Sequence, residues 1–126
     1  MEEQVLTNSE WYVMDCLWQR SPMTVMELVA ALGDKVGWAK STTITILRRM
    51  EEKGLVTVEV RDRAKHYTPA LERDKAARRE TRSFLDKVYR GSVGLMVSAM
   101  ADEKALSRAE IEELYDILRK AEEGMK

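Results

Sequence analysis

Residues 38–69 read WAKSTTITILRRMEEKGLVTVEVRDRAKHYTP, and their periodicity changes part-way along. From about Ala39 to Lys53 the apolar residues recur at the spacing of an α-helix. Residues 56–60 then alternate apolar with polar side chains, which predicts a half-buried strand. Residues 61–64 predict a polar turn, and residues 65–68 predict the returning strand. The stretch therefore predicts a helix with a β-hairpin, or wing, directly behind it.

Two capping boxes mark helices before this stretch. Thr7 with Glu10 opens a first helix. Thr24 with Glu27 opens a second helix, for which Gly33 is the expected C-terminal signal. Two short helices, a third helix and a hairpin predict a winged helix-turn-helix. The predicted fold class is mostly α with a small β-wing, followed by a C-terminal helical dimerisation arm.

The chain after residue 70 predicts that arm, so we expect two domains, 1–70 and 71–126. Residues 72–90 and the segment opened by the Ser107–Glu110 capping box are amphipathic, and residues 93–101 are unusually apolar. About 55 residues are too few to bury these faces well. We expect a second copy to cover them; the alternative is that they fold back on the N-terminal domain. The expected dimer interface comprises Phe84, Leu85, Val88, Leu95, Met96, Leu114, Ile117 and Leu118.

Charge is unevenly distributed, although the net charge of the chain is only −1. Residues 35–67 hold eight lysines and arginines against four acids, a net charge of +4, whereas residues 1–34 carry −5. A basic block between acidic ends is expected of an element that faces phosphates. Chance clustering on a solvated face is the alternative.

The exposed face of the third predicted helix carries short hydroxyl side chains first and long cations later. This order suits an α-helix in the major groove of DNA, where hydroxyls approach base edges and cations reach guanine or the backbone. The alternative is that the threonines are only poor helix formers on an exposed face. Cations of the wing are expected over the backbone or the minor groove, although cationic hairpin tips are common elsewhere. The expected DNA-binding residues are Lys40, Ser41, Thr42, Thr45, Arg48, Arg49, Arg61, Arg63 and Lys65.

The sequence contains no catalytic or metal-binding pattern. His66 is the one histidine, and it lies in the predicted wing beside Lys65 with no cleft suggested around it. One histidine and one cysteine, Cys16, cannot close a zinc site within a monomer. We therefore expect no enzyme activity, no metal and no cofactor. The single cysteine and the lack of a membrane-length apolar run or an export signal favour a cytoplasmic protein without membrane contact.

Six motifs follow one another along nearly the whole chain. They are SEWYVMDCLW (9–18), TVMELVAAL (24–32), WAKSTTITILRRMEEKGLV (38–56), Tyr67-Thr68-Pro69, Arg90-Gly91-Ser92, and Leu106-Ser107 followed by Glu110-Ile111-Glu112-Glu113-Leu114. In this order and spacing they resemble the penicillinase-repressor family of bacterial regulators, often called the BlaI/MecI/CopY type. The resemblance implies a DNA-binding winged helix, a helical dimerisation arm, and repression by a homodimer at palindromic operators with TACA/TGTA-like half-sites. It also matches Ser41, Thr42, Thr45 and Arg49 to the family's recognition-helix contacts.

Three departures from the family pattern bear on regulation and on the wing. Family members induced by β-lactams are cut by a membrane sensor protease at an Asn–Phe bond, where this chain has Ala99-Met100. Cleavage between Ala99 and Met100 is therefore not expected from the resemblance, and whether a regulatory protease acts on the chain stays open. The copper-responsive branch carries Cys-x-Cys pairs near the C-terminus, and their absence here excludes copper sensing by such a site. Asp62 stands where the family's wing has a glycine.

Two other functions are compatible with the same elements. A regulator of the PadR or MarR type would hold a small molecule between its domain and its dimer arm, near Tyr89, Met96 and Met100. Such a protein would be stabilised by its ligand. A winged helix can also serve protein–protein contact alone, in which case no salt-dependent binding to any duplex is expected.

Overall fold

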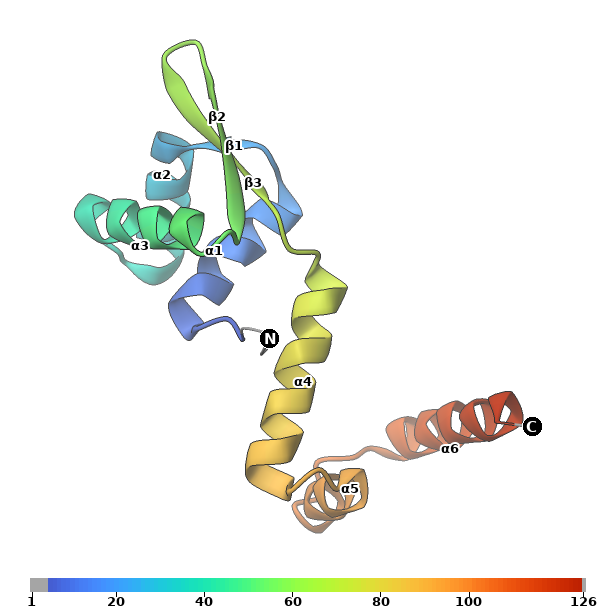
Figure 1. The fold of residues 1–126 in the computed structure, drawn as a ribbon. Helices are drawn as coiled ribbons and strands as arrows, with labels where there is room; N and C mark the ends of the chain where they lie inside the picture. The colour runs from blue at the N-terminus through green and yellow to red at the C-terminus, as the bar shows by residue number, and fades with distance from the viewer. Residues whose placement is uncertain (1–4, 126) are drawn as a thin grey trace. The chain divides into compact units, whose positions relative to one another are not determined.

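A computed structural model describes residues 5–125 of the chain (Figure 1). In chain order the elements are α1 (Asn8–Gln19), β1 (Met23–Thr24), α2 (Val25–Val36), α3 (Lys40–Glu52), β2 (Val56–Arg61), β3 (Ala64–Pro69), α4 (Arg73–Tyr89), α5 (Val93–Asp102) and α6 (Arg108–Gly124). The chain divides into two compact units within α4, between Thr81 and Arg82. The functional boundary expected at residue 70 stays a prediction.

Each of the three predicted capping boxes is present. The N-cap hydroxyl accepts a hydrogen bond from the backbone N–H three residues on, and the glutamate there accepts one from the N-cap N–H. Each box satisfies donors that the start of a helix leaves free, so it fixes where the helix begins. The boxes are Thr7–Glu10 at α1, Thr24–Glu27 at α2 and Ser107–Glu110 at α6.

The end of α2 lies further along the chain than expected, so the prediction for Gly33 was wrong. The helix runs to Val36, and its C-cap is Gly37, whose φ of 77° is left-handed. Gly33 lies inside the helix, where an added Cβ would lie 3.6 Å from the carbonyl oxygen of Trp38. A glycine inside a helix costs about 1 kcal/mol relative to alanine, which the packing of an otherwise amphipathic helix can offset.

The wing is an antiparallel hairpin closed by a two-residue loop. β2 and β3 pair along their whole length, up to Arg61 opposite Ala64. Asp62 and Arg63 form the loop, with φ values of 50° and 65°. Positive φ at both central residues is the mark of a type I′ turn, whose twist matches that of the flanking strands.

The sheet also contains a strand, β1, that the sequence did not predict. β1 pairs antiparallel with β3, which gives the strand order β1-β3-β2. Its partners are Met23 opposite Tyr67 and Thr24 opposite His66. Two residues are too short a segment for a period-2 pattern to be read.

Helices α1, α2 and α3 enclose an apolar core together with the sheet. Met14 and Leu28 are both 0% exposed and Leu47 is 1% exposed. The indole Nε1 of Trp18 donates a hydrogen bond to the carbonyl oxygen of Leu71 at 2.9 Å. The chain that leaves the wing is therefore tied back to α1, and the core holds α3 and the wing in one unit.

The unit that begins at Arg82 buries little of its apolar surface within the chain. Leu85 is 9% exposed, but Leu95 and Leu118 are 57% and 62% exposed. No described residue of α5 or α6 is buried. Exposed apolar surface on this scale is typical of a region that binds a partner. None of the helices in residues 5–125 is both long and apolar enough to cross a membrane.

Candidate nucleic-acid interface

One face of α3 is anchored in the core and the other faces solvent. Thr43, Leu47 and Met50 are buried and hold the helix against the core. Of the predicted contacts on α3, Thr45 is half-buried, and Lys40, Ser41, Thr42, Arg48 and Arg49 are exposed. At about 100° per residue, all of these except Lys40 fall within an arc of about 120°. A ligand lying along this side of α3 would therefore meet the hydroxyls and the arginines together.

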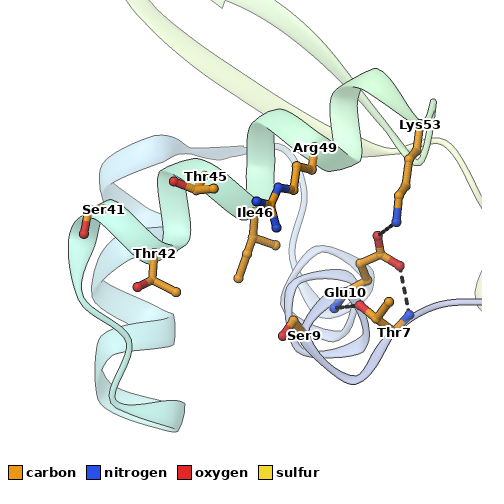
Figure 2. A pocket seen from close by; sticks show the side chains of 9 residues that line it. All are labelled: Thr7, Ser9, Glu10, Ser41, Thr42, Thr45, Ile46, Arg49 and Lys53. Atoms are coloured by element: carbon orange, nitrogen blue, oxygen red, sulfur yellow. Dashed lines mark hydrogen bonds and ion pairs between the residues drawn. The ribbon is translucent and has the colours of Figure 1, made fainter.

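A groove of about 540 Å³ lies between α3 and the start of α1 (Figure 2). Its α3 wall includes four predicted contacts, whereas Lys40 and Arg48 do not line it. Its α1 wall is polar and was not predicted. The lining residues are Ser41, Thr42, Thr45, Ile46, Arg49 and Lys53 on the α3 side, and Thr7, Ser9 and Glu10 on the α1 side.

Glu10 is a buried carboxylate that lines this groove, with its side chain only 5% exposed. Its Oε2 lies 2.6 Å from Nζ of Lys53, and its Oε1 accepts a hydrogen bond from the backbone N–H of Thr7 at 2.8 Å. Burial raises the pKa of Glu10, but hydrogen bonds from Lys53 and Thr7 together outweigh burial, and the net pKa lies below its ordinary value. The carboxylate is therefore ionised at neutral pH, and its charge is compensated.

The three predicted wing cations, Arg61, Arg63 and Lys65, are all exposed. Nε of Arg61 lies 3.4 Å from Oε1 of Glu59, in a pair whose side chains are 53% and 67% exposed. Exposed ion pairs contribute little free energy, so this contact does not tie Arg61 down. The wing cations do not line the groove. The predicted contacts thus form two groups, one on α3 and one on the wing.

Reasoning from the sequence missed the α1 wall of the groove. It assigned Thr7 and Glu10 to helix capping alone, and gave Ser9 and Lys53 no role in binding. Glu10 and Lys53 are 43 residues apart, and no local pattern predicts a contact at that separation. The sequence held one indication of this α1 wall, which was the run of polar residues at the start of the first helix.

The predicted dimer residues lie on α4, α5 and α6. Phe84, Val88 and Ile117 are about half exposed, at 47%, 49% and 52%. Phe84 packs edge-on against Tyr89, with ring centroids 5.9 Å apart. Of the other predicted residues, Leu95 and Leu118 are exposed, Met96 and Leu114 are half-buried, and Leu85 is buried.

The histidine and the cysteine, the side chains most typical of catalytic or metal sites, lie on different elements, β3 and α1. Nδ1 of His66 lies 3.1 Å from the carbonyl oxygen of Ala64, within the wing. Cys16 is half-buried in α1, and burial raises the pKa of its thiol, which keeps it protonated at neutral pH. In the described part of the chain, no three histidine, cysteine, aspartate or glutamate side chains are grouped to hold a metal ion.

Comparison with known proteins identifies the family. A family model described as penicillinase repressor matches residues 6–120. The chain belongs to the penicillinase repressor family. The resemblance carried by the six motifs is thereby confirmed, and the family is one of transcriptional repressors rather than enzymes.

Individual relatives of this penicillinase-repressor chain agree with the family match. The chain is 25% identical over 115 residues to the methicillin resistance regulatory protein MecI of Staphylococcus aureus strain N315, covering 91% of this chain and 94% of MecI. It is 30% identical over 113 residues to the penicillinase repressor of Bacillus licheniformis, covering 90% and 88%. The solution structure of the DNA binding domain of the repressor BlaI aligns with a TM-score of 0.52 and 26% identity, covering 56% of this chain and 85% of that domain. The predicted winged-helix fold is confirmed.

Proposed function

We propose that this penicillinase-repressor chain represses transcription as a homodimer that binds a palindromic operator through α3 and the wing. The two-sided character of α3 carries the proposal, because buried residues fix the helix while hydroxyls and arginines face outward. The major groove of DNA, about 12 Å wide, admits such a helix. The similarity to a structure described as the DNA binding domain of BlaI supports it.

Each part of the surface has a distinct role in this proposal. Ser41 and Thr42 lie at the N-terminal end of α3, which approaches base edges most closely in helix-turn-helix proteins. Thr45 follows one turn later. Arg48 is exposed outside the groove and reaches a guanine edge or a phosphate. The cations of the wing bind the backbone and so contribute affinity and orientation rather than sequence preference.

The second unit supplies the dimer contact. Its apolar side chains, including Phe84, Leu95 and Leu118, are exposed within one chain. A second copy that covers these side chains gains the free energy of removing them from water. A two-fold dimer would then present two copies of α3 to half-sites about 34–36 Å apart, one turn of the duplex. A palindromic site follows from that symmetry.

Selection from a randomised duplex library tests this function. We expect a two-fold symmetric sequence to be enriched, and its affinity to fall steeply with salt in fluorescence anisotropy titrations. Arg48→Ala should weaken binding. Arg78→Ala, which removes an exposed arginine of α4 instead, should leave binding unchanged.

The alternative function makes the opposite prediction. A winged helix that serves only protein–protein contact would enrich no sequence, even from a well-folded dimer. Its affinity for any duplex would be weak, and Arg48→Ala would have no effect. That result would move the functional surface to the helices of the second unit.

A further inference from the structure

Two cations line the groove between α1 and α3, and their surroundings differ. Arg49 and Lys53 lie four residues apart, about one helical turn, on the same side of α3 (Figure 2). The sequence predicted Arg49 as a DNA contact and gave Lys53 no role in binding. They differ in their partners within the described residues, because Lys53 forms an ion pair and Arg49 does not.

Lys53 already has an ion-pair partner within the protein, although its own side chain is 41% exposed. Its Nζ lies 2.6 Å from Oε2 of Glu10, whose side chain is 5% exposed. The other oxygen of that carboxylate accepts a hydrogen bond from the backbone N–H of Thr7. Removing Lys53 from this pair would leave a buried charge without its counter-ion, which is costly. Lys53 therefore stays on Glu10 when a phosphate approaches.

Arg49 is in the opposite situation. Its side chain is exposed, and it makes no ion pair or side-chain hydrogen bond with any other described residue. The groove that Arg49 lines also carries the hydroxyl of Ser9 at the start of α1, which can donate a hydrogen bond to a phosphate oxygen. The carboxylate in the same groove does not repel an anion, because Lys53 compensates its charge.

We infer that this groove binds one phosphate of the operator backbone with Arg49 as its cationic ligand, while Lys53 is a positioning residue that acts through Glu10. The inference rests on the proposed function and assigns Arg49 to the backbone rather than to a base. Guanidinium is suited to this role because it binds phosphate oxygens in a bidentate manner. The ion pair joins the start of α1 to the end of α3 and so sets the width of the groove.

The salt dependence of operator binding separates the two cations. Arg49→Ala should weaken binding to the operator and to unrelated duplex by a similar factor, about tenfold or more. Its plot of log affinity against log salt should be shallower by about 1.8, the contribution of one phosphate contact in each protomer of the dimer. Lys53→Gln should lower the melting temperature and the preference for operator over unrelated duplex, but leave the slope as in the wild type.

Two further variants test the positioning role. Lys53→Arg restores a cation opposite Glu10 and should recover the operator preference. Glu10→Gln retains a capping residue that suits its position in α1 but releases Lys53. We expect this variant to bind unrelated duplex more tightly, with a slope steeper by about 1.8, because the Lys53 of each protomer then reaches the backbone. Circular dichroism at the binding temperature verifies that each variant is folded.

Several results would overturn the inference. A shallower slope for folded Lys53→Gln would make Lys53 a DNA contact. An unchanged slope for Arg49→Ala, with relaxed preference at one base pair, would make Arg49 a base contact. Both results leave the proposed function intact, since the wild type still binds its operator. Failure of the folded wild type to bind any duplex would instead refute the proposed function itself, and this inference with it.

Discussion

Glu10 is charged in the folded protein although its side chain is buried. Its pKa therefore differs between the folded and unfolded states, and the free energy of unfolding depends on pH. Burial raises its pKa, but hydrogen bonds from Lys53 and Thr7 lower it below the ordinary value of 4.5. A carboxyl group with a lowered pKa stabilises the fold fully above its unfolded pKa. The stabilisation is lost as pH falls through the folded pKa, because the unfolded state then binds the proton first.

We therefore expect acid to destabilise the wild type more than Glu10→Gln. Melting temperatures measured from pH 7 down to pH 3 should begin to approach each other near the ordinary pKa of 4.5 and converge as the pH falls through the lower pKa of the folded state. Glu110→Gln is the matched control. It changes another capping box whose glutamate pKa is also lowered, by hydrogen bonds from Ser107, but which has no lysine partner and is exposed. An equal pH dependence for all three proteins would contradict the role given to Glu10.

Thr43 shows how a polar atom can be buried without a partner. The residue is 0% exposed on the core side of α3, and its Oγ1 has no hydrogen-bond partner in the described chain. We expect Thr43→Val to raise the free energy of unfolding by about 1 kcal/mol, since an apolar group of the same shape removes the desolvation cost. Thr43→Ala should instead lower it, by leaving a cavity. Chemical denaturation measures both, and operator affinity should change in neither.

The wing combines a loop with positive φ values and the proposed contacts to the DNA backbone, so we expect that stability and DNA affinity can be changed in opposite directions. Asp62 and Arg63 both have positive φ, which suits glycine and, less well, aspartate. Arg63→Gly should therefore raise the free energy of unfolding by about 1 kcal/mol, yet weaken DNA binding by removing a cation. Asp62→Gly should stabilise the protein less, but strengthen binding, because it removes a carboxylate between two arginines.

Denaturation and anisotropy on the same preparations measure this pair of effects. Arg63→Gln is the control, because it removes the charge without relieving the positive φ. It should weaken binding and bring no gain in stability. If both glycine variants changed DNA affinity in the same direction, the wing would not act through its charges.

Elements whose signals are local were predictable from the sequence, and contacts made by tertiary packing were not. The capping boxes confirmed at α1, α2 and α6 depend on two residues three apart, and the hairpin depends on period-2 alternation. Gly33 misled the prediction because its signal is local, whereas the helix around it is held by packing. The Glu10–Lys53 pair, and with it the α1 wall of the groove, needs α1 and α3 to be docked first.

In the proposed homodimer, two-fold symmetry would make DNA binding by the first unit depend on association of the second unit. A single winged helix contacts only a few base pairs. A dimer doubles the length of the recognised site by repeating the same contacts on a second half-site. Affinity for a palindrome then depends on how firmly the second units associate, because the second half-site is bound at a high effective concentration only within the dimer. A change confined to the second unit should therefore weaken operator binding without altering any residue of α3 or the wing.

Leu118→Lys tests this dependence. Leu118 is 62% exposed on the apolar side of α6, where Leu114 and Ile117 also lie. A lysine there would be desolvated in the dimer, so we expect monomers at micromolar concentration in sedimentation equilibrium, with operator affinity reduced by tenfold or more. Glu123→Lys adds a cation to the polar side of the same helix and should leave both properties unchanged.

A monomeric wild type, or a Leu118→Lys variant that stays dimeric, would refute α6 as the dimer contact. A monomer that kept full operator affinity would instead show that one winged helix reads the whole site.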